Sequence, residues 1–176
     1  MRIPKSKLGL TLFTTVAAFV AAIVLCQVFE WLGFPEQDQV KSIKDMAGWS
    51  LQFALMVVWI LLAAPVIEES LFRGLLFRLP SRFVTTAEPP RFFAFHARFF
   101  IAAASSAVFS FAHYIDFAAL CGGRGFALLP PSNAFPALFV VGIAWCWLYR
   151  RTGSLWCGML SHSLFNAINL LLALAV

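Results

Sequence analysis

The stretch SLQFALMVVWILLAAPVIEESLFRG, residues 50–74, decides the fold. It has no charged side chain as far as Ile67, and the same run then continues through three charged residues, Glu68, Glu69 and Arg73. A helix of about 20 apolar residues is long enough to cross the hydrocarbon core of a bilayer. We therefore predict a membrane-spanning helix over residues 48–77 that carries charged side chains inside the membrane.

The rest of the chain has the same apolar character. Hydrophobic residues make up 61% of the 176 residues and charged residues only 12%, whereas soluble domains carry about 25% charged residues. This leaves too little polar surface to cover a soluble globule. We predict an all-α, polytopic transmembrane bundle of about five helices that forms a single domain over residues 1–176. The other four helices are expected at residues 8–29, 99–120, 134–149 and 154–176.

The first apolar run, residues 8–29, has a second interpretation. It follows basic residues and contains Val20-Ala21-Ala22, which resembles the cleavage site of a signal peptide. The apolar run of a signal peptide is usually 7–15 residues long, and this run is longer. We therefore expect an uncleaved first helix, with cleavage as the alternative.

The basic residues divide unevenly between the two sides that this topology defines. Nine fall on the side of the amino terminus: Arg2, Lys5, Lys7, Arg78, Arg82, Arg91, Arg98, Arg150 and Arg151. Three fall on the other side: Lys41, Lys44 and Arg124. Segments rich in Lys and Arg stay in the cytoplasm, so we predict a cytoplasmic amino terminus and an outer carboxyl terminus, in the plasma membrane if the cell is bacterial. The basic residues form no continuous stripe, so they do not indicate nucleic-acid binding.

Residues 78–98 are predicted to form the loop after the second helix. They mix arginines with Phe83, Phe92, Phe93, Phe95 and Pro89-Pro90. Such a loop either lies in the headgroup region, with its aromatic rings down and its guanidinium groups out, or is an ordinary cytoplasmic connection.

Ionisable side chains inside a bilayer are rare and cost on the order of 3 kcal/mol each to insert, so they are candidates for function. In this chain they come from three helices. They are Glu68, Glu69 and Arg73 on the second helix, His113 and Asp116 on the third, and His162 on the fifth, which also carries the polar residues Asn166 and Asn169.

Helical spacing separates these residues by role. Glu69 and Arg73 stand at i and i+4, so they can form an ion pair within one helix. Glu68 points about 100° away and is free to face another helix. His162 and Asn166 share one face by the same i, i+4 spacing. Packing of these faces together would assemble a carboxylate base, imidazoles and an amide donor, a set that suits hydrolysis.

Three polar residues have plainer interpretations. Asp116 either orients His113 across one helical turn or, more simply, caps the end of the third helix. Asn169 is expected to form a hydrogen bond between helices, and His96 is assigned to the basic loop.

Three motifs carry a resemblance to a known family. Residues 68–74, EESLFRG, match EExxxR in the form that ends in FRG; residues 109–113, FSFAH, match FxxxH; and residues 162–166, HSLFN, match HxxxN. In this order, over residues 49–171, they resemble the CAAX protease and bacteriocin-processing superfamily, also called the ABI family. It consists of glutamate-type intramembrane endopeptidases and includes type II CAAX prenyl endopeptidase.

The resemblance implies a role for each residue of a catalytic core over residues 48–171. Glu68 would be the base that activates water, helped by His113, and His162 and Asn166 would stabilise the tetrahedral oxyanion. The structural ion pair would be formed by Glu69 and Arg73. No metal or other cofactor is implied.

The resemblance also implies the kind of substrate, a membrane-associated protein or peptide in the lipid bilayer. In a eukaryotic cell this would be a prenylated carboxyl-terminal peptide. In a bacterium it would be a leader peptide or a carboxyl-terminal sorting tail. Larger members of the superfamily have more helices than this chain, so its substrate cavity is either reduced or completed by a partner subunit or a second copy.

Two other interpretations stay open. Glu68, His113 and His162, with Asn166 nearby, are potential zinc ligands, although the sequence has no HExxH motif and no sulfur ligand beside them. The chain would also suit a non-enzymatic membrane protein, such as a bacteriocin immunity factor or a scaffold. A scaffold would tolerate a neutral isostere at Glu68, whereas a peptidase would not.

Overall fold

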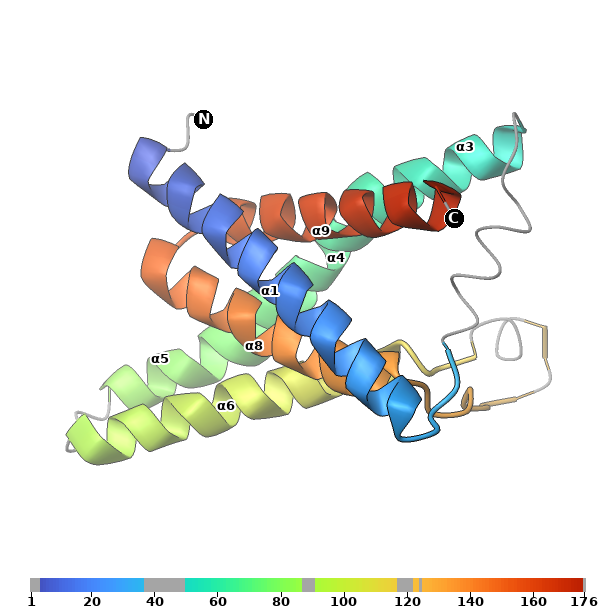
Figure 1. Cartoon of the computed structure of the whole chain (residues 1–176). Coiled ribbons are helices and arrows are strands. Elements are labelled where there is room, and N and C mark those ends of the chain that lie inside the picture. The colour runs from blue at the N-terminus through green and yellow to red at the C-terminus, as the bar shows by residue number, and fades with distance from the viewer. Residues whose placement is uncertain (1–3, 37–49, 87–90, 117–121, 124, 176) are drawn as a thin grey trace.

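The structure, a computed structural model, describes residues 4–36, 50–86, 91–116, 122–123 and 125–175. These residues form five long helical segments (Figure 1). They are α1 (Lys5–Trp31), a continuous segment from Leu51 to Thr86, α6 (Arg91–Ala112), α8 (Ala134–Thr152) and α9 (Leu155–Ala175). The continuous segment comprises α3 (Leu51–Val58), the π-helix η1 (Trp59–Ala63), α4 (Ala64–Glu68), the π-helix η2 (Glu69–Arg78) and α5 (Leu79–Thr86).

Four of the segments are long and apolar enough to cross a membrane, namely Lys5–Trp31, Leu51–Val84, Phe92–Ala112 and Leu155–Ala175. The fifth, α8, has Arg150 and Arg151 in its last turn. Many large apolar side chains on the outside of the bundle are exposed, as a surface covered by lipid requires. The prediction of an all-α, polytopic transmembrane bundle is therefore confirmed.

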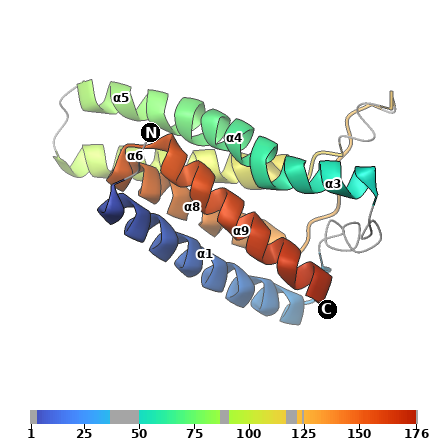
Figure 2. The same cartoon turned by 90° about the horizontal axis from the view of Figure 1, so that it is seen from above.

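The core of the bundle surrounds α8, which makes its most extensive contacts with α1 and α6. Figure 2 shows α1 on one side of the molecule and the continuous segment from α3 to α5 on the other, with α8 and α9 between them. A Cβ atom at Gly142 of α8 would lie 2.8 Å from Cβ of Ser106, so the glycine allows α8 to approach α6 closely. The main cluster of buried apolar side chains includes Ala18, Phe72, Phe109, Val141, Trp145 and Phe165.

The region predicted as a basic loop is helical. The second helix continues to Thr86 and α6 begins at Arg91, so only residues 87–90, which lie outside the described ranges, separate the two helices. Arginine and leucine favour helix, and the phenylalanines that suggested an interfacial loop lie exposed on α5 and α6. The prediction of a loop over residues 78–98 is therefore wrong, and its location in the headgroup region or in the cytoplasm stays a prediction.

The third helix ends earlier than predicted. It stops at Ala112, and the chain then pairs through an isolated antiparallel bridge between Ile115 and Leu128. Asp116 lies beyond the helix because its amide takes part in this pairing, and aspartate is a weak helix former. The predicted helix over residues 117–120 falls outside the described part of the chain.

Candidate active site

Three segments bring one carboxylate and two imidazoles together. Glu68 is the last residue of α4, His113 follows α6, and His162 lies on α9. The Oε2 atom of Glu68 lies 4.0 Å from Nε2 of His113 and 3.8 Å from Nε2 of His162. These separations exceed direct hydrogen bonds, and a water molecule about 2.8 Å from both atoms of either pair is compatible with them.

Glu68 is the accessible carboxylate of the two in the motif. Its side chain is 25% exposed, whereas that of Glu69 is 0% exposed. The Oε2 atom of Glu68 is itself buried and has no hydrogen-bond partner among the described residues. A buried carboxylate oxygen without a protein partner requires a reason, and a role in chemistry is one such reason.

Glu69 is held by two basic side chains. Its Oε1 atom lies 3.1 Å from Nη1 of Arg73, four residues later, and 3.3 Å from Nδ1 of His162. Arg73 is fully buried and donates from Nη2 to the carbonyl of Gly142 at 3.3 Å. Its guanidinium carbon also lies 4.6 Å from the ring centroid of Phe109, which adds a cation–π contact. The structure thus brings together the two residues expected to pair, inside the bundle.

His162 is fixed in orientation from two sides. Its Nδ1 atom faces Glu69, and its ring stacks on the indole of Trp145 with centroids 4.1 Å apart and an interplanar angle of 25°. Trp145 in turn donates from Nε1 to Oγ of Ser161 at 3.0 Å, and that hydroxyl lies 2.8 Å from Oγ1 of Thr15 on α1. The imidazole is therefore set so that Nε2 faces Glu68.

Sequence reasoning missed Trp145. It lies in an apolar stretch of α8 that also contains Trp147, and no sequence signal separates the tryptophan that packs on the site from the one that does not.

Gly158 is a second residue that sequence reasoning missed. A Cβ atom at this position would lie 2.7 Å from Oε2 of Glu69, so the absence of a side chain lets the carboxylate lie against α9. The available signal was spacing, because Gly158 stands four residues before His162 on the same face of its helix.

Asn166 lies near the cluster, but one of its amide hydrogens is already used. Its Nδ2 atom donates to the backbone carbonyl of Ile60 at 2.9 Å. In the π-helix η1 the amide of Ala64 bonds to the carbonyl five residues earlier, and by the same pattern the carbonyl of Ile60 would receive the amide of residue 65. That residue is Pro65, which has no N–H. Asn166 therefore supplies the donor that the proline lacks.

The remaining polar residues differ from what was expected of them. Asn169 donates to the carbonyl of Phe165 in its own helix at 2.8 Å, which differs from the bond between helices that was expected. Nδ1 of His96 lies 2.8 Å from the carbonyl of Phe92, within α6 rather than in a loop. Asp116 is not one helical turn after His113, because α6 has ended before both residues.

The described part of the chain contains no group of three or more His, Cys, Asp or Glu side chains arranged to hold a metal ion. The metal-free site inferred from the motifs stays a prediction, with zinc as its alternative.

Comparison with known proteins gives one match. A family model described as type II CAAX prenyl endopeptidase Rce1-like matches residues 50–168, a range that contains all three motifs. No curated protein and no solved structure matches the chain. The resemblance drawn from the motifs is confirmed by the family match.

Proposed function

We propose a glutamate-type peptidase mechanism for this chain, which belongs to the type II CAAX prenyl endopeptidase Rce1-like family and is therefore an integral membrane protease. In this proposal Glu68 is the base that activates the attacking water. The supporting observation is the position of its Oε2 atom, which faces Nε2 of both His113 and His162 and has no hydrogen-bond partner among the described residues.

The environments of the two glutamates support this assignment. A general base must reach water and take a proton from it. Glu68 is partly exposed, whereas Glu69 is fully buried between Arg73 and His162. In this proposal Glu69 orients His162, whereas Glu68 acts on the attacking water beside the substrate.

His113 is suited to orient the water. Its Nδ1 atom lies 2.9 Å from the carbonyl of Phe109, and only a protonated nitrogen can donate to a carbonyl. In the neutral ring Nε2 is then a hydrogen-bond acceptor that faces Glu68. A water bound between the two would give one hydrogen to Oε2 of Glu68 and the other to Nε2 of His113.

Hydrolysis would then proceed through a tetrahedral intermediate. The water oxygen attacks the carbonyl carbon of the scissile peptide bond as Glu68 takes its proton, and the carbonyl electrons move to the oxygen. When the carbonyl re-forms, the carbon–nitrogen bond breaks. Glu68 then gives the proton to the departing amine and returns to its carboxylate form.

The oxyanion of this intermediate would be stabilised by His162 and Asn166. With Nδ1 of His162 directed at Glu69, Nε2 is the ring nitrogen left to face the oxyanion, and it donates there when it carries a hydrogen. The amide of Asn166 has two hydrogens, and its bond to Ile60 uses one of them. Preorganised donors of this kind act on charge that appears only in the transition state.

The family indicates the class of substrate. A protease of this family acts on membrane-associated proteins in a lipid environment. We infer a prenylated carboxyl-terminal peptide as the substrate in a eukaryotic cell, and a leader peptide or carboxyl-terminal sorting tail in a bacterium.

The test is a comparison of membrane proteomes from cells that carry the wild type, Glu68→Gln or Glu30→Gln. Glu30 is an exposed glutamate of α1, so its substitution controls for expression and for the loss of a carboxylate. We expect an uncleaved precursor to accumulate only with Glu68→Gln. Identical proteomes from all three strains would count against the peptidase mechanism.

Chelation separates this mechanism from its zinc alternative. Cleavage by the purified protein in detergent should survive a strong chelator, and elemental analysis should find well under one metal per chain. Stoichiometric zinc that is lost together with activity would make Glu68, His113 and His162 ligands instead.

A further inference from the structure

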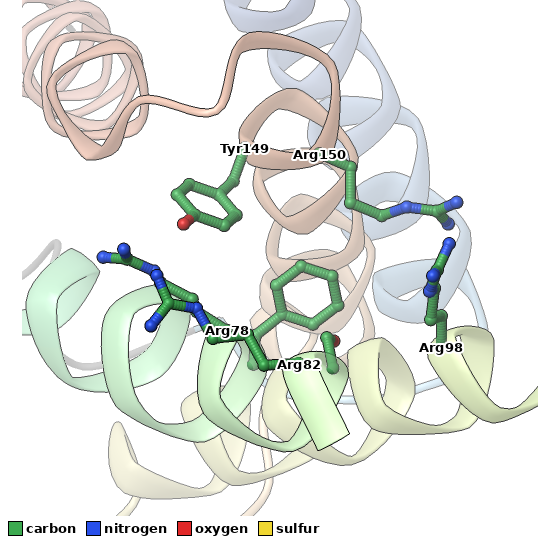
Figure 3. Close-up of a pocket in the computed structure, with 7 residues that line it drawn as sticks. Arg78, Arg82, Arg98, Tyr149 and Arg150 are labelled. Carbon is green, nitrogen blue, oxygen red and sulfur yellow. The ribbon is translucent and has the colours of Figure 1, made fainter. Parts of the chain in front are cut away.

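A basic cavity lies at one end of the bundle, away from the candidate active site. It has a volume of about 440 Å³ and is lined by Phe77, Arg78, Ser81, Arg82, Arg98, Tyr149 and Arg150. The four arginines come from η2, α5, α6 and α8. Figure 3 shows Arg98 and Arg150 pointing towards one another on one side, with Arg78 and Arg82 beside Tyr149 on the other.

The side chains that line this cavity are basic or neutral. None of its described lining residues is acidic. In the part of the chain that the structure describes, no carboxylate forms a salt bridge with Arg78, Arg82 or Arg150. Several guanidinium groups around one space repel each other unless an anion lies between them.

Topology alone does not require this arrangement. Retention of a segment in the cytoplasm needs only basic residues near the membrane. Arg151 is an example of a basic residue that meets this need without lining the cavity. It adjoins Arg150 and lies over the ring of Trp147 with its guanidinium carbon 5.5 Å from the centroid. The convergence of four arginines on one space is a separate feature.

We propose that this cavity binds a phosphate group, supplied by the headgroup of an anionic phospholipid. Arginine presents a planar fork of N–H donors that matches phosphate oxygens in pairs. A zwitterionic choline headgroup carries a cation that the arginines would repel, whereas a phosphatidylglycerol headgroup does not.

Two observations favour lipid over a soluble phosphate. The cavity lies where the spans Leu51–Val84 and Phe92–Ala112 approach their adjoining ends, which is the depth of the headgroups. The neighbouring residues Phe83 and Phe99 are exposed, by 75% and 52%, and can lie against acyl chains. A phosphate bound here would therefore have apolar surface beside it.

The cavity is independent of peptide hydrolysis. Arg78 follows Glu68 by ten positions along one continuous helical segment, which places it roughly 15 Å further along the axis. A variant of the cavity therefore tests lipid binding without removing a residue of the candidate active site.

The experiment uses the full chain, purified and delipidated in a nonionic detergent. Native mass spectrometry measures the binding of phosphatidylglycerol and of phosphatidylcholine to three proteins. They are the wild type, Arg82→Gln/Arg150→Gln, and the control Lys5→Gln/Arg151→Gln, which removes two exposed charges from the same end of the bundle without touching the cavity lining. Thermal melting of the three proteins checks that each is folded.

We expect wild type to prefer phosphatidylglycerol, and Arg82→Gln/Arg150→Gln to bind it at least about tenfold more weakly, since each lost arginine removes charge-assisted hydrogen bonds. The control should bind as wild type does. Equal weakening in the control, or equal binding of the two lipids, would overturn the proposal. A parallel titration with inorganic phosphate separates the two sources: binding as tight as that of the lipid would overturn the assignment to a headgroup.

Discussion

Glu68 and Glu69 are neighbours in the sequence but have opposite environments, and this difference can be measured. Glu68→Gln keeps the shape of the side chain and removes its basicity. We expect a folded protein whose turnover falls by at least about 10²–10⁴-fold, the range that a general base contributes. Glu69→Gln should instead lower the melting temperature, because it leaves Arg73 buried without its counter-charge.

Kinetics and melting curves of the purified variants in detergent provide both measurements. The double variant Glu69→Gln/Arg73→Gln should recover part of the lost stability, because it leaves no buried charge unpaired. A folded but inactive Glu69→Gln beside an active Glu68→Gln would show that the two roles have been exchanged.

Gly158 allows a test of the contact between Glu69 and α9. Alanine within a helix is normally more stable than glycine by up to about 1 kcal/mol. At Gly158 we expect the opposite sign, because the new methyl group would lie 2.7 Å from Oε2 of a carboxylate that Arg73 and His162 hold in place. The melting temperature and the turnover of Gly158→Ala should both fall.

The matched control is Gly9→Ala on α1, where a Cβ atom meets nothing within 4 Å. It should be neutral or slightly stabilising. If Gly158→Ala were as stable and as active as Gly9→Ala, Glu69 would not be fixed against α9.

Sequence reasoning identified the candidate site residues that belong to short motifs. Glu68, His113 and His162 belong to motifs of a few residues, and the structure brings them together. Trp145 could not be found in this way, because its contact with His162 depends on how α8 packs against α9. Gly158 had only its i, i+4 spacing from His162 as a signal.

The π-helix η1, which is followed by Pro65, makes the segment before the glutamates depend on another helix. Asn166→Ala would leave the carbonyl of Ile60 without a donor inside an apolar bundle, at a cost of about 1–3 kcal/mol. We expect a lower melting temperature. Turnover should fall by about 10²–10³-fold, as for the loss of one oxyanion donor, with a trace of activity retained because His162 can still donate.

Two further variants isolate the structural part of this effect. Asn169→Ala removes an amide that bonds only within its own helix in the described structure, so its stability should change little. Pro65→Ala restores an N–H to the helix, so Asn166→Ala should destabilise the protein less in that background than in the wild type. An equal loss in both backgrounds would contradict the role assigned to Asn166.

Helix existence was easier to predict than helix ends. Apolar runs gave all five long segments, but the polar content of residues 78–98 suggested a loop where α5 and α6 continue. Near residue 113 the reverse error occurred. An apolar run suggested helix up to residue 120, whereas α6 ends at Ala112 and the chain pairs with residues around Leu128. Over residues 78–98 local helix propensity outweighs polar composition, whereas beyond Ala112 the pairing of Ile115 with Leu128 takes the place of helix.

The arrangement of the bundle supports the predicted topology. Lys7 donates to the carbonyl of Thr152 at 2.5 Å, so the start of α1 and the end of α8 lie together. This end of the molecule also holds the arginine cavity. A reporter fused near Thr86 should therefore be active only in the cytoplasm, and one fused after Val176 only on the outer side. The reverse result for both fusions would invert the orientation and leave the bundle itself unchanged.

The pairing of Glu69 with Arg73 within one helix has a consequence for biosynthesis. Helices enter a membrane in the order in which the ribosome makes them, and His162 follows Glu69 by 93 residues. During that interval Glu69 lacks His162, yet its partner at i+4 is already present. The nascent helix can thus be released into lipid with its two opposite charges neutralising each other. The cluster of Glu68, His113 and His162 is complete only when α9 has been made, so the proposed catalytic centre would assemble last.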